Sequence, residues 1–262
     1  MDLNLSGKSA LITGASKGIG LACAARLLRE GTHVHLVART EADLINAQDQ
    51  LQQLASADSA GVTYTAADLS DSQQVDALCR NQTDLDILVN NAGAIPGGSL
   101  DDVDEARWRE AWDLKVFGYI NMCRRIYATM RERYQTNQRN GVIINVIGVG
   151  GERPSAGYAA GAGGNAALMA LSRAMGGVSR RDGIRVIGVN PGQIVTERLE
   201  TLQRSIAAKR WGDESRWQEL RDERYPPGQP EHIGDLVAFL ASDLSANTTG
   251  TVVTVDGGHS AR

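Results

Sequence analysis

The sequence contains no apolar run that approaches the ~20 residues a membrane-spanning helix needs. Its first four residues lack the basic flank and the apolar stretch of a secretory signal peptide. Only three cysteines occur in 262 residues, and the scattered positions of Cys23, Cys79 and Cys123 match no metal-binding spacing. We therefore expect a cytoplasmic protein with reduced thiols and no bound metal.

An excess of positive charge is also missing, since 27 Lys and Arg stand against 31 Asp and Glu, for a net charge of −4. This balance gives no reason to expect nucleic acid or an anionic membrane as a partner. The sequence has no internal repeat and no low-complexity tract, and 42% of its residues are hydrophobic. A chain of this length and composition suits a single domain over residues 1–262 with a sizeable core.

Three glycines follow the first predicted strand. Residues 9–13 are mostly apolar, Gly14, Gly18 and Gly20 come next, and an amphipathic run covers residues 21–30. Such glycines let backbone N–H groups approach a pyrophosphate, and the helix that follows directs its positive end toward it. A glycine-rich turn is common in α/β proteins. Here it lies after the first strand and at a helix start, where a nucleotide fold needs it.

Residues 13–20 resemble the nucleotide fingerprint of the short-chain dehydrogenase/reductase family, and three later segments extend the resemblance over nearly the whole chain. They are Asn-Asn-Ala-Gly at 90–93, Asn-Pro-Gly with a following Thr at 190–196, and Asp-Gly-Gly at 256–258. The resemblance implies a Rossmann-like, doubly wound parallel α/β sheet of about seven strands with helices on both faces. It also implies a small-molecule substrate.

The second predicted strand, residues 34–38, ends at Arg39 where an NAD-binding unit usually has an acid. Arg39 can take a ribose 2′-phosphate, with Lys17 in the facing loop, although an isolated Arg is commonly a solvated loop residue. We predict NADP(H) as cofactor in preference to NAD(H). In the resembled family the Asp at 68 meets the adenine, but capping a local turn is an equally physical use. The predicted cofactor-binding residues are Gly14, Ser16, Lys17, Gly18, Ile19, Gly20, Arg39, Asp68, Leu69, Asn91, Ala92, Gly93, Pro191, Gly192, Ile194 and Thr196.

The resembled family uses a Ser, a Tyr, a Lys four positions after the Tyr, and an Asn on the preceding long helix. The run that begins at Asn165 resembles the family's Lys-Ala-Ala-Leu segment, which places the Tyr position at Gly161 and the Ser position at Gly148. The Asn position falls on Lys115. All four positions are therefore substituted in this alignment.

A second alignment takes Tyr158 as the family tyrosine. It requires a three-residue deletion between strand and helix, and the residue four positions later is Ala162. No Tyr-x-x-x-Lys pair results from either alignment.

We predict that Tyr158 and Lys115 stand in for the missing pair as catalytic residues. Tyr158 lies about one helical turn before Gly161, so its phenol can enter the space that Gly161 leaves. Lys115 can reach toward the space at Asn165, and an ammonium beside a phenol lowers the pKa of the phenol. Burial would lower the pKa of the lysine itself and weaken this effect. The alternative is that Tyr158 packs in a loop and Lys115 snorkels to solvent.

A long helix is predicted over residues 105–133. One face of it carries a stripe at steps of four and three. We expect this stripe to form subunit contacts, giving a homodimer or homotetramer. The glycines at 161–164 serve either as space for a ligand or as close packing across the same dimer. The stripe consists of Trp108, Trp112, Lys115, Tyr119, Met122 and Ile126.

A charged segment with Trp211 and Trp217 follows Thr196. The resemblance places this segment over the substrate, and its length predicts two helices that form a lid over residues 197–225. An oligomer contact would equally explain the tryptophans. The functional prediction is an NADP(H)-dependent oxidoreductase for a small, apolar or ring-containing carbonyl compound or alcohol. A lyase, isomerase or hydrolase on the same scaffold, or an inactive nucleotide-binding protein, remains the alternative.

Overall fold

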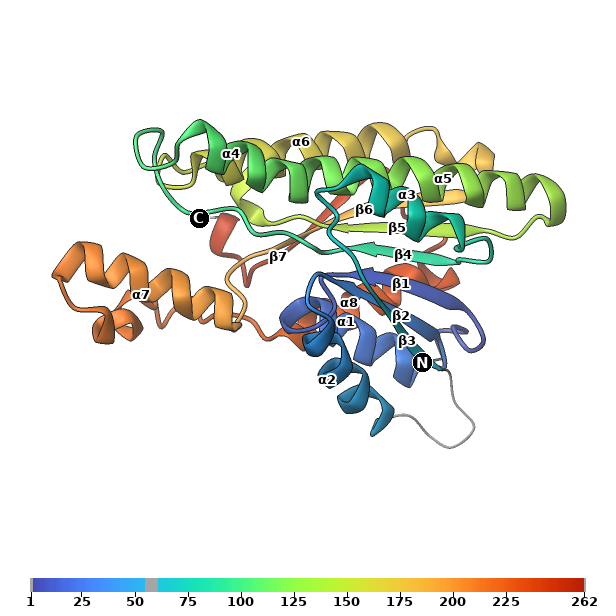
Figure 1. The fold of residues 1–262 in the computed structure, drawn as a ribbon, viewed down its shortest axis with the longest axis horizontal. Helices are drawn as coiled ribbons and strands as arrows, with labels where there is room; N and C mark the ends of the chain where they lie inside the picture. The colour runs from blue at the N-terminus through green and yellow to red at the C-terminus, as the bar shows by residue number, and fades with distance from the viewer. Residues whose placement is uncertain (1, 55–60, 262) are drawn as a thin grey trace.

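The computed structural model describes residues 2–54 and 61–261. A parallel seven-stranded sheet in the order β3-β2-β1-β4-β5-β6-β7 lies at its centre, with helices on both faces (Figure 1). The predicted Rossmann-like doubly wound sheet of about seven strands is therefore confirmed. The strands are β1 (Ser9–Thr13), β2 (His33–Ala38), β3 (Val62–Ala66), β4 (Ile87–Asn90), β5 (Gly141–Val146), β6 (Ile184–Pro191) and β7 (Val252–Val255).

Helices α1, α2 and α8 cover one face of the sheet, and α3, α5 and α6 cover the other (Figure 1). Every residue of β5 and β6 is buried, as expected for parallel strands with helices on both faces. None of the described helices is both long and apolar enough to cross a bilayer. The helices are α1 (Gly18–Arg29), α2 (Glu41–Gln52), α3 (Ser72–Arg80), α4 (Glu105–Trp112), α5 (Gly118–Asn137), α6 (Ala159–Gly176), α7 (Glu197–Trp211) and α8 (Pro230–Ala241).

Helix α3 was not predicted from the sequence. This helix has only nine residues and buries a narrow apolar face formed by Val75, Leu78 and Cys79. Its start was readable, because the Asp71 carboxylate caps the helix by accepting a hydrogen bond from the Gln73 backbone N–H at 2.8 Å.

The long helix predicted over residues 105–133 is divided in two. A π-helical turn over Asp113–Phe117 separates α4 from α5 and has Lys115 at its centre. Such turns occur mostly as single-turn insertions inside α-helices, and they are frequent at functional sites. The apolar spacing of the sequence hides the insertion, because both pieces keep their apolar residues on the same side.

The predicted use of the aromatic and apolar stripe as a subunit contact is wrong for most of its length. Lys115, Tyr119, Met122 and Ile126 are all at most 7% exposed within a single chain. They pack on the protein's own sheet, because α5 crosses the sheet with this face inward. The homodimer or homotetramer stays a prediction, and its subunit contact would have to form on another surface of the chain.

A buried polar network ties β4 and β5 to α6. The Asn90 side-chain amide donates to Asn145 Oδ1, and Asn145 Nδ2 donates to Ser172 Oγ, both at 2.9 Å. The Ser172 hydroxyl donates in turn to the Leu168 carbonyl at 2.8 Å. All three polar side chains are fully buried, so each depends on the others for its hydrogen bonds.

We predict that Asn145→Ala lowers the free energy of unfolding by about 1–3 kcal/mol, because it leaves buried partners on both sides without a hydrogen bond. Urea denaturation measures the change. Asn46→Ala, at an exposed position of α2, is the matched control and should change little. Equal effects of the two substitutions would contradict the importance of the network.

Candidate functional site

The glycine loop turns sharply at the carboxyl end of β1. Gly14 has a φ of 62°, and a Cβ built on it would lie 2.9 Å from the Ala92 Cα. A Cβ on Gly20 would lie 2.2 Å from the Gly14 carbonyl oxygen. Neither position admits a side chain, so no side chain covers the backbone of the loop at these two residues. Helix α1 begins at Gly18 without an acidic residue in its first turn, so its positive end is not neutralised.

Asn91 braces this loop from the end of β4. Its side-chain amide donates to the carbonyl oxygens of Thr13 and Gly14, each at 3.1 Å. The Thr13 hydroxyl accepts hydrogen bonds from the backbone N–H groups of Asn91 and Ala92 at 2.8 and 3.0 Å. Asn91 and Ala92 therefore hold the glycine loop in shape.

The segment after β6 completes the same edge of the sheet. The methyl group of Thr196 would lie 3.4 Å from a Cβ on Gly18, and Gly192 packs against Asp256. Thr196 also caps α7 by accepting a hydrogen bond from the Leu199 N–H at 3.2 Å. The predicted cofactor segments thus converge at the carboxyl ends of the strands, where doubly wound sheets bind ligands.

Some predicted cofactor-binding side chains are occupied elsewhere. The Asp68 carboxylate accepts hydrogen bonds from the backbone N–H and the hydroxyl of Ser70, at 3.0 and 2.8 Å, so it caps a local turn. The side chains of Leu69 and Ile194 are buried in the core. Only the backbones of Leu69 and Ile194 are left to meet a ligand.

Two basic residues lie near the loop. Arg39 is exposed after β2, and within residues 2–54 and 61–261 no hydrogen bond or ion pair holds its guanidinium. Lys17 pairs with Glu197 at 3.0 Å, and this contact raises the pKa of Lys17. Because both partners are exposed, the ion pair is weak and a phosphate can replace it. Ser16 is half-buried beside them.

The Tyr158 ring lies over Gly161. A Cβ built on Gly161 would be 1.9 Å from the Tyr158 Cζ, the carbon that carries the hydroxyl. The backbone around Tyr158 is fixed by Gly98, which donates to the Gly157 carbonyl at 2.8 Å and accepts from the Ala159 N–H at 3.3 Å. The phenol therefore fills the volume that a side chain at position 161 would take.

Two neighbouring glycines make room for Trp112. The indole ring lies 3.3 Å from a Cβ built on Gly163, and its nitrogen lies 3.4 Å from one on Gly164. The indole N–H donates to the Ala160 carbonyl at 2.9 Å. The glycines at 161, 163 and 164 thus accommodate aromatic rings of the same chain, and packing across a dimer is not needed to explain them.

Lys115 is buried and does not snorkel. Its ammonium donates a hydrogen bond to the Ile147 carbonyl, and its methylenes pack against Gly93, where a Cβ would lie 2.8 Å from the Lys115 Cδ. Burial, with a smaller contribution from the charge of Arg198, lowers the pKa of Lys115 to about 7. A lysine in this state exchanges its proton near neutral pH.

The side chain of Asn165 has an oxygen without a hydrogen-bond partner. It is 2% exposed, and its Nδ2 lies 3.2 Å from a Cβ built on Gly148. Its Oδ1 has no hydrogen-bond partner among the described residues. Since buried polar atoms are nearly always paired, this acceptor suits a hydroxyl of a bound molecule. The side chains of Lys115 and Asn165 meet consecutive residues, Ile147 and Gly148, at the end of β5.

The expected lowering of the Tyr158 pKa is wrong. Burial raises the pKa of this phenol, and the charge of Arg198 opposes the rise only in part. No hydrogen bond joins Tyr158 to Lys115 in the part of the chain that the structure describes. Desolvation therefore outweighs the charge of Arg198 at Tyr158 and adds to it at Lys115, and it favours a neutral phenol and a partly neutral amine.

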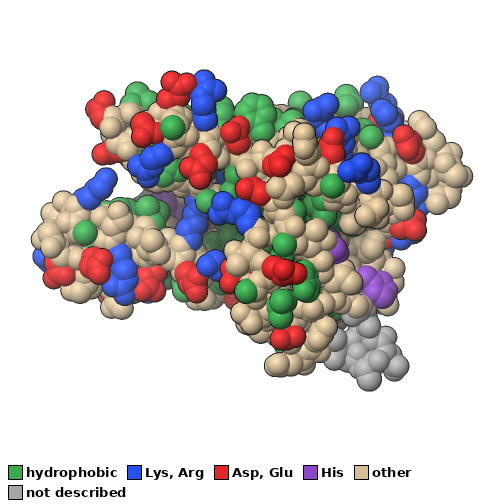
Figure 2. Space-filling view, in the orientation of Figure 1, with side chains coloured by type: hydrophobic (Ala, Val, Ile, Leu, Met, Phe, Trp, Pro, Cys, Tyr) green, Lys and Arg blue, Asp and Glu red, His purple; other side chains and the backbone are tan. Residues whose placement is uncertain are grey.

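Arg198 was not among the residues predicted from the sequence. This residue lies in the first turn of α7, and its guanidinium donates hydrogen bonds to the carbonyl oxygens of Gly93 and Ile95. Figure 2 shows Lys and Arg side chains gathered around the hollow between the α7 lobe and the rest of the molecule. A single arginine in a charged segment carries no sequence signal that separates it from the other arginines there.

The segment over residues 197–225 contains two helices, the α-helix α7 and a short 3₁₀ helix over Glu214–Leu220, and its role as a lid stays a prediction. Trp211 and Trp217 are half-buried in it. Each ring is flanked by two arginine guanidinium groups at 4.6–5.4 Å from its centroid, so these tryptophans are engaged within the segment.

The sequence model described as short chain dehydrogenase matches residues 8–207. The chain belongs to the short-chain dehydrogenase family. It is 33% identical to 2-keto-3-deoxy-L-fuconate dehydrogenase of Xanthomonas campestris over 98% of this chain and 81% of that protein. It is 30% identical to L-xylulose reductase of Bos taurus over 98% of both chains.

Among solved structures, this short-chain dehydrogenase is similar to L-sorbose reductase from Gluconobacter frateurii in complex with NADPH and L-sorbose. The TM-score is 0.87, with 29% identity over 98% of both chains. The family is one of oxidoreductases that act on small molecules, and none of the relatives named here is a lyase, isomerase or hydrolase.

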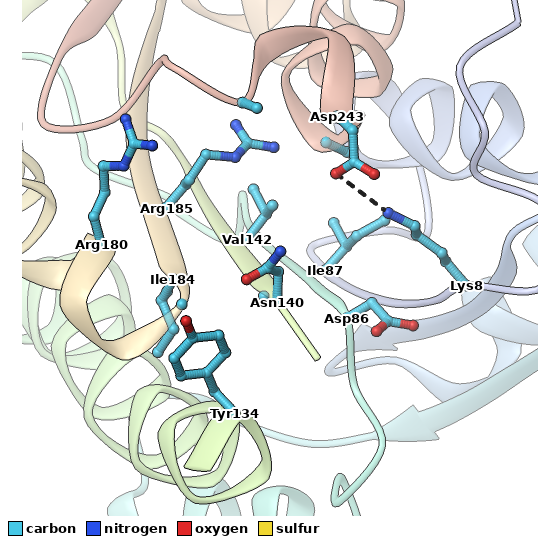
Figure 3. Close-up of a pocket in the computed structure, with 14 residues that line it drawn as sticks. Lys8, Asp86, Ile87, Tyr134, Asn140, Val142, Arg180, Ile184, Arg185 and Asp243 are labelled. Carbon is cyan, nitrogen blue, oxygen red and sulfur yellow. Dashed lines mark ion pairs between the residues drawn. The ribbon is translucent and has the colours of Figure 1, made fainter. Parts of the chain in front are cut away.

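A pocket lies at the opposite edge of the sheet, among residues that precede the strands (Figure 3). Two of its cations, Arg180 and Arg185, are held by hydrogen bonds to uncharged groups, and the other charges are paired. Lys8 lies 3.8 Å from Asp243, and Asp86 pairs with Arg139 and Arg133. Ligands of doubly wound sheets bind at the other edge, so we place the functional site at the glycine loop.

We predict a pH-dependent effect of Lys115→Met on stability. The pKa of Lys115 is about 7 in the folded protein against an ordinary 10.5, so between these values the unfolded chain binds a proton that the folded chain releases. The free energy of unfolding of the wild type therefore rises with pH through this window. The advantage of Lys115→Met over the wild type should be largest below about pH 7 and shrink toward pH 10.

Urea denaturation of the nucleotide-free proteins at several pH values measures this difference. Lys209→Met, at an exposed lysine, is the matched control for the loss of an ammonium group. A difference between Lys115→Met and the wild type that does not change with pH would contradict the burial of the charged form.

Proposed function

We propose that this protein is an NADP(H)-dependent oxidoreductase that interconverts a small carbonyl compound and its alcohol, with Tyr158 and Lys115 in the roles of the family tyrosine and lysine. One observation carries the proposal. The Tyr158 phenol occupies the volume of a side chain at position 161, where the family alignment places the tyrosine. The phenol thus stands in the right part of the fold although its residue is displaced by three positions.

Four observations support NADP(H) as the cofactor. The bare backbone of the glycine loop suits a pyrophosphate, and the unpaired Arg39 suits a 2′-phosphate. The unsatisfied Oδ1 of Asn165 suits a ribose hydroxyl. A solved relative binds NADPH on the same fold. When bound, the nicotinamide supplies or accepts the hydride.

In this proposal Tyr158 and Lys115 have different roles in proton transfer. Burial keeps the Tyr158 phenol protonated at neutral pH, so it can donate its proton to a carbonyl oxygen that gains negative charge. Lys115, with a pKa of about 7, suits a group that delivers and removes protons at that pH. Lys115 is held for this role by Gly93 and the Ile147 carbonyl.

The segment over residues 197–225 acts as a lid in this proposal. Arg198 ties α7 to Gly93 and Ile95, and the Lys17–Glu197 pair ties it to the glycine loop. An apolar or ring-containing substrate would meet Tyr158 and the adjoining cluster of Ile95, Ala111 and Ala160. The named relatives act on sugars and a sugar acid, which supports a small carbonyl compound as substrate.

We predict that NADPH binds about 10- to 100-fold more tightly than NADH, because a charge-assisted contact of Arg39 with the 2′-phosphate contributes about 1.5–3 kcal/mol. Arg39→Ala should remove most of this preference by weakening NADPH binding alone. Calorimetric titration measures both nucleotides. Arg80→Ala, at an exposed arginine of α3, is the control. Equal affinity of the wild type for NADH and NADPH would contradict the assignment.

We predict that Tyr158→Phe and Lys115→Met each lower kcat about 10²–10⁴-fold while NADPH affinity changes little, because general acid–base groups contribute rates of this order. The assay follows NADPH oxidation with a panel of small ketones and keto-sugars. Gly161→Ala should have a similar effect, since its Cβ displaces the phenol.

The matched controls remove the same groups far from the site. Tyr127→Phe deletes a phenol that donates to Asp182, and Lys8→Met deletes an ammonium at the opposite edge of the sheet. Near wild-type kcat in both Tyr158→Phe and Lys115→Met would refute their catalytic roles. Tight NADPH binding without turnover of any carbonyl compound would leave the inactive nucleotide-binding protein as the better description.

A further inference from the structure

Arg198 is fixed on the two residues that adjoin the proposed catalytic groups. Its guanidinium donates hydrogen bonds to the carbonyl oxygens of Gly93 and Ile95, the latter at 3.0 Å. The methylenes of Lys115 pack against Gly93, and Tyr158 packs against the apolar cluster that contains Ile95. The guanidinium is therefore held next to residues that pack against both proposed catalytic groups.

Arg198 has no acidic partner among the described residues, and in α7 it shares this only with Arg210 at the far end of the helix, whose guanidinium lies over the Trp211 ring at 5.0 Å. The nearby charges of the helix are compensated, so their effects at a distance largely cancel, whereas that of Arg198 does not. These compensated pairs are Glu197 with Lys17 at 3.0 Å, Glu200 with Arg204 at 2.7 Å, and Lys209 with Asp102 at 3.8 Å.

The guanidinium has donors to spare. An arginine carries five N–H donors in a planar fork, and two of the Arg198 nitrogens each use one on a backbone carbonyl. The remaining donors match the two oxygens of a carboxylate. The charge of Arg198 also lowers the pKa of both Lys115 and Tyr158, so its field reaches both groups. An exposed guanidinium with no carboxylate partner among the described residues attracts an anion, and Lys115 adds to this attraction when it is protonated.

We propose that the substrate is an oxo acid or hydroxy acid whose carboxylate pairs with Arg198 while its carbonyl or hydroxyl group faces Tyr158. This substrate class rests on the proposed oxidoreductase function. The carboxylate also cancels part of the field of Arg198 at Lys115. Substrate binding therefore favours the ammonium form of Lys115, which is the form that can supply a proton.

The test compares two acids with their neutral methyl esters, pyruvate with methyl pyruvate and benzoylformate with methyl benzoylformate. For the wild type with NADPH, kcat/KM for the acid should exceed that for its ester by about 10- to 100-fold, mainly through KM. Arg198→Met should bring this ratio close to one, and Arg198→Lys should keep part of it. Arg204→Met, on the same helix but paired with Glu200, should keep the full ratio.

Binding is measured separately from turnover, by calorimetric titration of the protein–NADP⁺ complex with each acid and ester. If no compound is reduced but the acids bind more tightly than the esters, and Arg198→Met removes the difference, the oxidoreductase function fails while the anion site stands. If the esters are reduced as well as the acids, the function stands and the anion site is refuted.

Two further outcomes overturn the proposal. One is an acid-to-ester ratio in Arg198→Met equal to that of the wild type, together with weaker NADPH binding, which would assign Arg198 to the cofactor. The other is equal dissociation constants for acid and ester in the absence of turnover.

Discussion

The burial of one lysine constrains the whole site. The Lys115 ammonium has a backbone carbonyl, that of Ile147, as its hydrogen-bond partner in the described structure, and removing a charge from water is costly unless it is paired. The fold meets this cost by letting the pKa fall to about 7, so that the amine is neutral part of the time. The π-helical turn and the missing side chain of Gly93 make the space in which the lysine can lie.

Around this lysine, aromatic rings fill the space that glycines leave. The ring of Tyr158 occupies the space above Gly161, and the indole of Trp112 lies against Gly163 and Gly164. Glycines weaken a helix, each by up to about 1 kcal/mol relative to Ala. At the start of α6 they are tolerated because packing against the rings takes the place of intrinsic helix preference. As a result, the Tyr158 phenol fills the space at position 161, where the family alignment has the side chain of another residue.

The elements were largely predictable because the chain repeats a simple pattern. Buried strands read as short apolar runs, and α1, α2 and α8 show apolar residues on one face, so their positions followed from periodicity. Two misses have physical causes. The nine-residue α3 offers too few turns for a periodic signal, and the π-helical turn at Asp113–Phe117 changes the helix without changing which side is apolar.

The shape of the glycine loop was also readable, since the loop needs residues without side chains at fixed positions of the sequence. The surroundings of Lys115 and Tyr158 were not. Whether Lys115 is buried, whether the Tyr158 pKa rises or falls, and which of the arginines after residue 197 bonds to Gly93 and Ile95 all depend on groups far apart in the chain. The sequence by itself determined the parallel fold, through four segments that resemble one family, and the turn after β1, through its glycines. Tertiary structure alone decided the charge state of the lysine and the placement of Arg198, because desolvation and hydrogen-bond partners exist only once the chain is packed.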